Sequence, residues 1–223
     1  MEIKPIAHIE NDYKDKFAVP RQSGITDIKS RIVFEKEYSS MDAVRGLEDF
    51  SHIWLIWGFS ENVNSKKSLT VRPPRLGGNK RVGVFASRSP YRPNSLGLSS
   101  VKLDSVDYKD SELILTVSGA DLISGTPIYD IKPYIKFSDS HPEAVSGFVD
   151  TNEFKTLEID DSLKLLEKVP EEKRNALILA LKNDPRPAYH GDGNRIYGFG
   201  FSDWEIKFRV ENGTAFITEI TGV

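Results

Sequence analysis

The sequence contains no cysteine among its 223 residues. A disulfide framework, a thiolate metal site and a cysteine nucleophile are therefore excluded, while the redox compartment stays undetermined. No stretch approaches the roughly 18 consecutive apolar residues that a membrane helix needs, and the first residues lack the basic and apolar regions of a signal peptide. We therefore expect a soluble, cytoplasmic protein with no membrane partner.

Acidic residues are missing from residues 62–103, although the whole chain has 33 of them. This segment carries nine of the 30 Lys and Arg residues, which leaves 21 basic against 33 acidic residues elsewhere. Such a local basic field binds phosphate groups even when the net charge is −3. The alternative is that these cations pair with acids elsewhere in the fold. The nine residues are Lys66, Lys67, Arg72, Arg75, Lys80, Arg81, Arg88, Arg92 and Lys102.

Common catalytic signatures are also absent. The chain has no phosphate loop of the form G-x-x-x-x-G-K-[ST], no G-x-G-x-x-G dinucleotide fingerprint and no G-x-S-x-G nucleophile elbow. The four histidines form no H-x-H or H-x-x-x-H pair. Asp139, His141 and Glu143 are the one candidate metal set, but Pro142 favours a turn there. We expect no metal site.

Short strands dominate the first two thirds of the chain. Segments rich in Val, Ile, Leu and aromatic residues are separated by Gly, Pro or Asn, and only residues 39–50 show a helical pattern. This arrangement predicts an antiparallel sandwich or barrel rather than a doubly wound sheet. The expected strands lie within residues 31–38, 52–60, 81–87, 96–106 and 112–119.

The composition changes after about residue 150. Residues 160–169 and 170–184 read as two helices, the second with Pro170 in its first turn. Residues 195–220 then alternate apolar and polar side chains around Asn212-Gly213, a type I′ hairpin turn. The sequence therefore predicts a first domain over residues 1–150 and a small C-terminal α+β domain over residues 151–223.

An acid-containing stretch, residues 118–143, follows the last of the early strands. It places Asp130, Lys132 and Tyr134 at every second position, hence on one strand face. Such a face is often a solvated outer surface. In a cleft, the same three side chains would put an acid, a cation and a phenol within reach of one ligand.

Five segments together closely resemble one family. The first three are "YKDKFAVPRQSGI" (13–25), "GLEDFSHIWLIWGF" (46–59) and "VRPPRLGGNKRVGVFASRSPYRPNSLGLS" (71–99). The others are "GTPIYDIKPYI" (125–135) and "NDPRPAYH" (183–190). In this order they are similar to the TrmO family of S-adenosylmethionine-dependent tRNA methyltransferases. The resemblance implies a small, non-Rossmann β-barrel methyltransferase, usually a homodimer. It also implies methylation of N6 of threonylcarbamoyladenosine beside the anticodon of threonine tRNA.

The resemblance also implies a set of cofactor-binding residues. After "WGF", relatives carry a His-Gln-like pair where this chain has Ser60 and Glu61. The resemblance keeps this contact position and leaves the role of the two side chains open. Residues 119–122 resemble the family loop that contacts the cofactor through its backbone. The full set is Pro20, Arg21, Gln22, Ser60, Glu61, Arg88, Leu98, Gly119, Ala120, Asp121 and Leu122.

The reaction itself makes further demands. Methyl transfer from a sulfonium is an in-line displacement, so positioning supplies most of the rate enhancement. The proton of N6 has three candidate acceptors, namely Asp130, Tyr134 and water. The carboxylate of the threonylcarbamoyl arm needs cations or amides, and Arg92, Asn94 and Lys132 are the candidates. For tRNA phosphates the candidates are Lys66, Lys67, Arg72, Arg75 and Arg81.

Two other functions remain open from the sequence. One keeps the cofactor and changes the methyl acceptor to another nucleic acid or a small molecule. The other is an RNA-binding module without catalysis, with the segment from Lys66 to Arg92 on phosphates and Tyr91 stacked on a base. Binding of S-adenosylmethionine would separate the RNA-binding module from the two methyltransferase functions.

Overall fold

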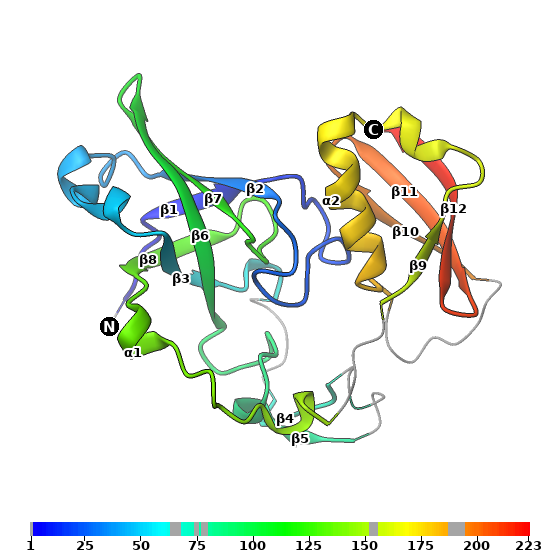
Figure 1. Ribbon diagram of the computed structural model, residues 1–223. Coiled ribbons are helices and arrows are strands. Elements are labelled where there is room, and N and C mark those ends of the chain that lie inside the picture. Colours follow the sequence, from blue (N-terminus) through cyan, green and yellow to red (C-terminus); the bar gives the residue numbers. More distant parts are fainter. Residues whose placement is uncertain (1, 63–67, 74–75, 77–79, 152–155, 187–194) are drawn as a thin grey trace.

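Six antiparallel strands close a barrel in the N-terminal part of the molecule, at the left of Figure 1. The computed structural model describes residues 2–62, 68–73, 76, 80–151, 156–186 and 195–223. The strand order around the barrel is β1-β2-β7-β6-β3-β8. The prediction of a mainly β chain with an antiparallel barrel is confirmed. The bounds are β1 Ala7–Glu10, β2 Lys29–Phe34, β3 His52–Gly58, β6 Leu96–Lys109, β7 Glu112–Ser118 and β8 Pro127–Pro133.

The barrel interior follows from the alternation of apolar side chains along each strand. On β7, Leu113, Leu115 and Val117 are fully buried, and the residues between them are partly exposed. Burial of each such side chain contributes about 1.5–3 kcal/mol, which drives the inward face of every strand to the same core. On β3, Ile53, Leu55 and Trp57 point inward in the same way.

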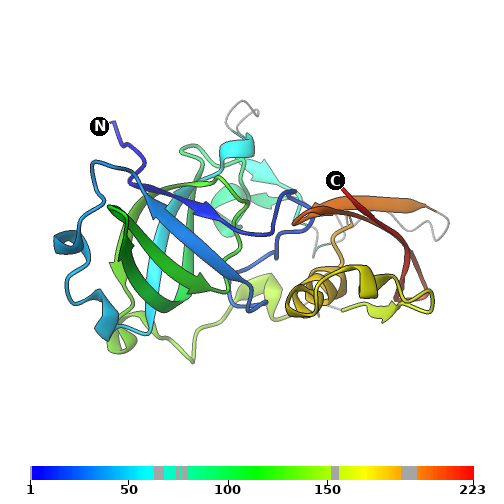
Figure 2. The ribbon, with the colours of Figure 1, turned by 90° about the horizontal axis from the view of Figure 1, so that it is seen from above.

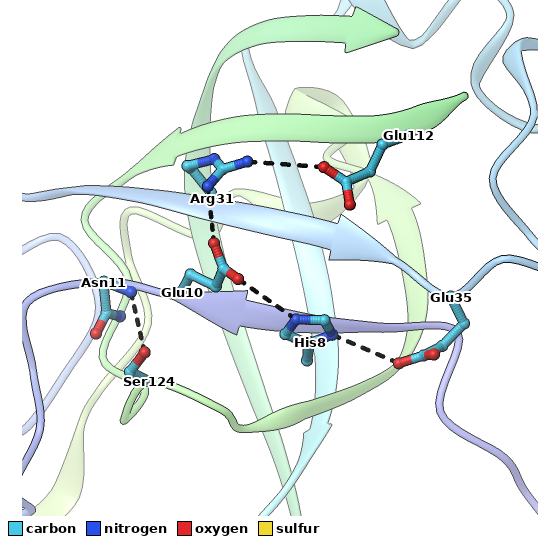
Figure 3. A network of polar contacts seen from close by, with 7 residues as sticks. All are labelled: His8, Glu10, Asn11, Arg31, Glu35, Glu112 and Ser124. Atoms are coloured by element: carbon cyan, nitrogen blue, oxygen red, sulfur yellow. Dashed lines mark hydrogen bonds and ion pairs between the residues drawn. The ribbon is translucent and has the colours of Figure 1, made fainter. Parts of the chain in front are cut away.

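Exposed polar side chains cover the opposite face of β1 and β2. Figure 3 shows Arg31 between Glu10 and Glu112, with nitrogen–oxygen distances of 2.8 and 4.0 Å. His8 lies between Glu10 and Glu35, at 3.7 and 3.4 Å. Exposed pairs of this kind contribute about 0–1 kcal/mol each, so this face is a solvated surface.

A four-stranded sheet with one helix across it forms the C-terminal part, at the right of Figure 1. The strand order is β10-β11-β12-β9, with β9 parallel to β12 and the other pairs antiparallel. Positive φ angles of 48° at Asn212 and 78° at Gly213 confirm the type I′ turn. The bounds are β9 Glu158–Asp160, α2 Glu171–Lys182, β10 Ile196–Phe201, β11 Trp204–Glu211 and β12 Thr214–Gly222.

Two expected helices are wrong. Residues 39–50 form two 3-10 turns, η1 Met41–Val44 and η2 Leu47–Asp49, separated at Gly46 with φ 84°. The one helical element in residues 160–169 is η7 Leu165–Lys168, because Lys164 is left-handed and the Asp161 carboxylate accepts from the amides of Leu165 and Leu166. The remaining short elements are η3 Ser60–Asn62, β4 Thr70–Val71, β5 Val82–Gly83, η5 Val84–Ala86, α1 Lys136–Asp139 and η6 Gly147–Val149.

The segment between β1 and β2 belongs to both parts of the molecule. Figure 2 shows this segment running from the barrel to the C-terminal sheet. Tyr13, Ala18 and Ile28 pack in the hydrophobic cluster of α2 and the C-terminal sheet, apart from the barrel core. Lys173 on α2 donates to Asp12 at 2.8 Å and to Ser202 at 2.7 Å. The split after residue 150 stays a prediction.

None of the helices within the described residues has the length and hydropathy that crossing a membrane demands.

Gly97 of β6 provides a test of the packing at one end of the barrel. A Cβ atom at Gly97 would overlap the indole ring of Trp57, which is 7% exposed. We expect Gly97→Ala to lower the free energy of unfolding by about 1–3 kcal/mol, because the ring has to move out of its packed position. Denaturant unfolding measures this change.

Gly83→Ala is the matched control for this substitution. Nothing lies within 4 Å of a Cβ at Gly83, and its φ of −59° is open to any L-residue. The control should change stability by no more than about 0.5 kcal/mol. Equal stability of the two variants would contradict the packing of Trp57 on Gly97.

Candidate active site

The loop after β7 lies against the segment that precedes β2. The amide of Gly24 donates to the carbonyl of Gly119 at 2.9 Å, and the amide of Gly119 donates to Ile28 at 3.3 Å. Gly119 has φ 83°, and a Cβ there would lie 3.3 Å from backbone atoms of Gly24 and Thr26. Only glycine allows this close approach without strain, so Gly119 sets the path of residues 119–122.

Asn11 holds the same loop from its other side. Its side-chain amide donates to the carbonyl of Leu122 at 2.9 Å, and its backbone amide donates to the Ser124 hydroxyl at 3.3 Å (Figure 3). Asn11 was not expected from the sequence, because its partners in this loop lie more than 100 residues away. The local signal is an Asx turn directly after β1, since Asn11 Oδ1 accepts from the amide of Tyr13 at 2.9 Å.

Three of the expected cofactor residues lie together beside this loop. Gln22 accepts a hydrogen bond from the guanidinium of Arg88, which joins segment 20–24 to the loop that follows η5. Arg88 is also one of the charges that act on the carboxyl group of Asp121. The structure therefore brings Gln22, Arg88 and Asp121 to one place from three distant parts of the chain.

Asp121 is the acid of this cluster. Desolvation raises the pKa of its carboxyl group. The hydroxyl of Ser99, the backbone amides of Asp121 and Ser23, and the charge of Arg88 act in the opposite direction without cancelling the effect. The site thus holds a partly buried carboxyl group whose ionisation is sensitive to what binds next to it.

Two residues that the sequence analysis did not select support Asp121 from inside the barrel. The hydroxyl of Ser99 donates to Asp121 Oδ1 at 2.5 Å, and the indole of Trp57 donates to Ser99 Oγ at 3.0 Å. Ser99 is 2% exposed. A serine in alternation with Val101 and Leu103 on the inward face of β6 was the available signal, since buried hydroxyl groups need partners.

The other expected cofactor residues are spread around this cluster. Pro20 is buried, and Arg21 donates to the carbonyls of Asp184 at 2.9 Å and Arg186 at 3.3 Å. Arg21 therefore ties the segment to the stretch after α2. Ser60 and Glu61 are exposed in η3, and Leu98 on β6 is 56% exposed. Gly119, Ala120 and Leu122 are buried in the loop itself.

Asp130, Lys132 and Tyr134 lie on the outer face of the barrel. Lys132 pairs with Asp130 at 3.2 Å, both side chains being about half exposed, and Asp130 also accepts from the amide of Ile131. The ring of Tyr134 packs near those of His52 and Trp54, on the outward side of β3. No hydrogen bond or ion pair within the described residues connects these three with Asp121.

Two of the three residues expected to hold the substrate arm, Arg92 and Asn94, lie in the loop before β6. Arg92 donates to the carbonyls of Ser87 at 3.1 Å and Ser89 at 3.4 Å, which fixes this loop on itself. Asn94 is exposed. The guanidinium of Arg92 thus donates to carbonyl groups. It forms no ion pair with an acid within the described part of the chain.

The basic segment is only partly described. Lys66, Lys67 and Arg75 lie outside the described residues. Arg72 and Arg81 are exposed, and Arg81 donates to Thr70 at 3.0 Å. Neither forms an ion pair with a described residue, whereas Lys102 pairs with Asp104 at 2.9 Å. An acidic residue of the described chain therefore pairs with Lys102, through its near neighbour Asp104, and with neither Arg72 nor Arg81.

The candidate metal set does not gather around one point. Asp139 accepts hydrogen bonds from the indole of Trp54 and the amide of Ile135, and His141 pairs with Glu143 at 3.7 Å. Both hydrogen bonds lower the pKa of the Asp139 carboxyl group. These contacts give Asp139 a structural role at the start of α1.

A separate cavity of about 210 Å³ lies in the C-terminal part. Arg186 and Arg195 each lie over the ring of Tyr197, at 5.8 and 5.5 Å from its centre. None of the expected cofactor residues lines this cavity. Its lining includes Phe17, Arg186, Arg195, Tyr197, Phe199 and Phe208.

Comparison with known proteins decides the family. The model of the tRNA-methyltransferase O N-terminal domain matches residues 8–140, and that of the TrmO C-terminal domain matches residues 155–223. The chain belongs to the TrmO family. The expected family is therefore confirmed.

Individual relatives agree with this assignment. A tRNA (adenine(37)-N6)-methyltransferase of Escherichia coli is 38% identical over 218 residues, which cover 94% of this chain and 93% of that protein. A probable S-adenosyl-L-methionine-binding protein of Pyrococcus abyssi is 35% identical over 153 residues, or 68% of this chain and 78% of that protein. A crystal structure of TrmO from Pseudomonas aeruginosa has a TM-score of 0.76 at 26% identity, covering 100% of this chain and 99% of that one.

The raised pKa of Asp121 predicts a pH dependence of stability. Because its folded pKa lies above its unfolded value, the carboxyl group contributes stability that is fully present in acid and is lost as the pH rises through the folded pKa. We expect the free energy of unfolding of the native chain to fall relative to that of Asp121→Asn as the pH rises through the folded pKa of Asp121. Denaturant unfolding of both proteins from acid to neutral pH measures the difference, and parallel stability curves would contradict it.

Proposed function

We propose that this chain transfers a methyl group from S-adenosylmethionine to N6 of threonylcarbamoyladenosine beside the anticodon of threonine tRNA. Membership of the TrmO family supports an S-adenosylmethionine-dependent tRNA N6-methyltransferase. The observation that carries the location of the site is the cluster of Gln22, Arg88 and Asp121 beside loop 119–122.

The charges of this cluster fit the cofactor. S-adenosylmethionine carries a cationic sulfonium and an amino-acid end with one positive and one negative group. A partly buried carboxyl group beside a guanidinium offers one partner of each sign. Residues 119–122 would hold the cofactor with backbone groups, with Pro20, Arg21, Ser60, Glu61 and Leu98 around them. The bound cofactor supplies an activated methyl group, and the chain aligns the acceptor nitrogen with it.

The proposed substrate adds a carboxylate that unmodified adenosine lacks. Arg92 has no acidic partner within the described residues, and its bonds to Ser87 and Ser89 hold the guanidinium in place. An Arg held in this way is preorganised for a charge-assisted contact with a carboxylate. Asn94 and Lys132 are the other candidates for this arm. Lys132 already forms an ion pair with Asp130 on the outer face of the barrel.

The acceptor of the N6 proton stays open between Asp130, Tyr134 and water. Asp130 and Tyr134 lie on the outer face of the barrel, where they form no described contact with the Asp121 cluster. This placement favours water, because an N-methylated ammonium-like product is acidic and needs no strong base. A homodimer and a cytoplasmic location stay predictions.

The substrate is tested with tRNA that either carries or lacks the threonylcarbamoyl group. We expect methyl transfer only to the modified nucleoside, because a site built for a carboxylate rejects a ligand that leaves its cation unpaired. The measurement is the nucleoside mass after digestion. Arg92→Ala should lower transfer by about tenfold or more, whereas Arg45→Ala, an exposed arginine paired with Asp42, should not.

Two outcomes of this experiment would overturn parts of the proposal. Methylation of both tRNAs would remove the threonylcarbamoyl specificity. Cofactor binding without methylation of either tRNA would point to another acceptor. An RNA-binding module without catalysis is the remaining alternative, and failure to bind the cofactor would favour it.

The phosphate-binding role of the basic segment is tested by salt dependence. Replacing Arg72 and Arg81 together by Ala should weaken binding to all RNAs alike and flatten the plot of log affinity against log salt. Each lost phosphate contact removes about 0.7–0.9 from the slope, since fewer counterions are released. Filter binding at several salt concentrations measures this slope. An unchanged slope would mean that these residues do not contact RNA.

A further inference from the structure

We propose that Ser99 is a positioning residue for methyl transfer, because its hydroxyl links the indole of Trp57 to the carboxylate of Asp121 at the edge of the cofactor site. The proposal rests on the proposed function, since it gives the side chain of Asp121 a role toward the cationic cofactor. Neither Ser99 nor Trp57 is among the residues that the family resemblance implies.

The hydrogen-bond chemistry fixes the direction of this chain. An indole nitrogen only donates, so the bond of 3.0 Å from Trp57 Nε1 occupies an acceptor position of Ser99 Oγ. The single proton of the hydroxyl is then free for Asp121 Oδ1, 2.5 Å away. Ser99 is 2% exposed, so water does not compete for these positions. The donor order is therefore Trp57, Ser99, Asp121.

The indole at the start of this chain has little freedom to move. Trp57 is 7% exposed and packs its ring over Gly97, where no Cβ would fit. It meets the ring of Phe59 edge-on, with 4.4 Å between the ring centres. A fixed indole gives the Ser99 hydroxyl one preferred orientation. Ser99 in turn holds one oxygen of Asp121 in a constant position.

The effect on Asp121 is electrostatic as well as geometric. A hydroxyl that donates to a carboxyl oxygen favours the ionised form. The positive charge of Arg88 acts in the same direction, while burial acts against it. Tyr13 is buried and hydrogen-bonded to Thr26 at 2.8 Å. Burial, and to a smaller extent the charge of Asp121, raise the pKa of its phenol. Ser99 therefore helps to keep a negative charge in place for a cationic ligand.

A second indole on the same strand provides an internal comparison. Trp54, on the outward side of β3, donates directly to Asp139 Oδ2 at 2.9 Å. The indole N–H of each tryptophan is therefore linked to an aspartate. Only Trp57 is linked through a hydroxyl, and only Trp57 lies beside the expected cofactor residues. A signal specific to the site should appear at Trp57 and not at Trp54.

Cofactor affinity of Ser99 variants gives the first test, with S-adenosylmethionine as the probe in calorimetry. Ser99→Ala should weaken binding by about tenfold, the effect of one lost hydrogen bond to a charged group. Ser99→Thr keeps the hydroxyl and should restore affinity to within about threefold of the native chain. Ser100→Ala, on the opposite face of β6, should bind as the native chain does.

A double-mutant cycle shows whether Ser99 acts through Asp121. If it does, the variant with both Ser99→Ala and Asp121→Asn should bind the cofactor no more weakly than Asp121→Asn alone. A purely structural role of Ser99 predicts additive losses instead. Circular dichroism checks that each variant is folded.

The indole resonance of Trp57 gives a readout that does not depend on Ser99 variants. On addition of S-adenosylmethionine to the native chain, the Trp57 Nε1–H signal should shift and that of Trp54 should stay. The Trp57 shift should be reduced in Asp121→Asn. Nuclear magnetic resonance with assignment by Trp57→Phe measures both signals.

The possible failures are distinguishable. If the native chain does not bind the cofactor, the proposed function fails. If the native chain binds it but Ser99→Ala binds equally well, or the Trp57 signal does not respond, the role of Ser99 is wrong and the proposed function stands. If Ser99→Ala does not fold, the Trp57 response in the native chain and in Asp121→Asn decides.

Discussion

The contact between the backbones at Gly24 and Gly119 is the constraint on which the candidate site depends. Both residues have positive φ angles, and the 2.9 Å hydrogen bond between them joins segment 20–28 to the loop after β7. A side chain at Gly119 would separate the two segments. With them in contact, Asp121 accepts a hydrogen bond from Ser99 inside the barrel, and the charge of Arg88 acts on its carboxyl group.

This contact also connects the site to the C-terminal part. Segment 11–28 adds three buried residues, Tyr13, Ala18 and Ile28, to the hydrophobic cluster of α2 and its sheet, and Arg21 donates to two carbonyls just after α2. A movement of the C-terminal part relative to the barrel would therefore pull on the residues around Gln22. Residues from the N-terminal part of the sequence thus take part in the packing of the C-terminal sheet and α2.

Local sequence patterns predicted much of the fold. Short runs of Val, Ile, Leu and aromatic residues marked β2, β3, β6 and β7, and Asn212-Gly213 marked a turn whose φ angles are as expected. Closure of the barrel was beyond these patterns, because the pairings of β1 with β8 and of β2 with β7 join distant residues. The helix expected over residues 160–169 failed because Asp161 caps a short 3-10 turn and Lys164 is left-handed.

The candidate site shows the same limit. The family resemblance named Gln22, Arg88 and Asp121, which the fold brings together. Trp57, Ser99 and Asn11 looked like ordinary strand or loop residues in the sequence. Their roles depend on partners 22 to 111 residues away, which no local pattern encodes.

Hydrogen exchange with and without S-adenosylmethionine tests whether the cofactor binds where segment 20–24 meets loop 119–122. We expect added protection of backbone amides to concentrate at these two segments and at β6 near Ser99. Protection confined to the cavity around Tyr197, with no change at residues 119–122, would contradict it.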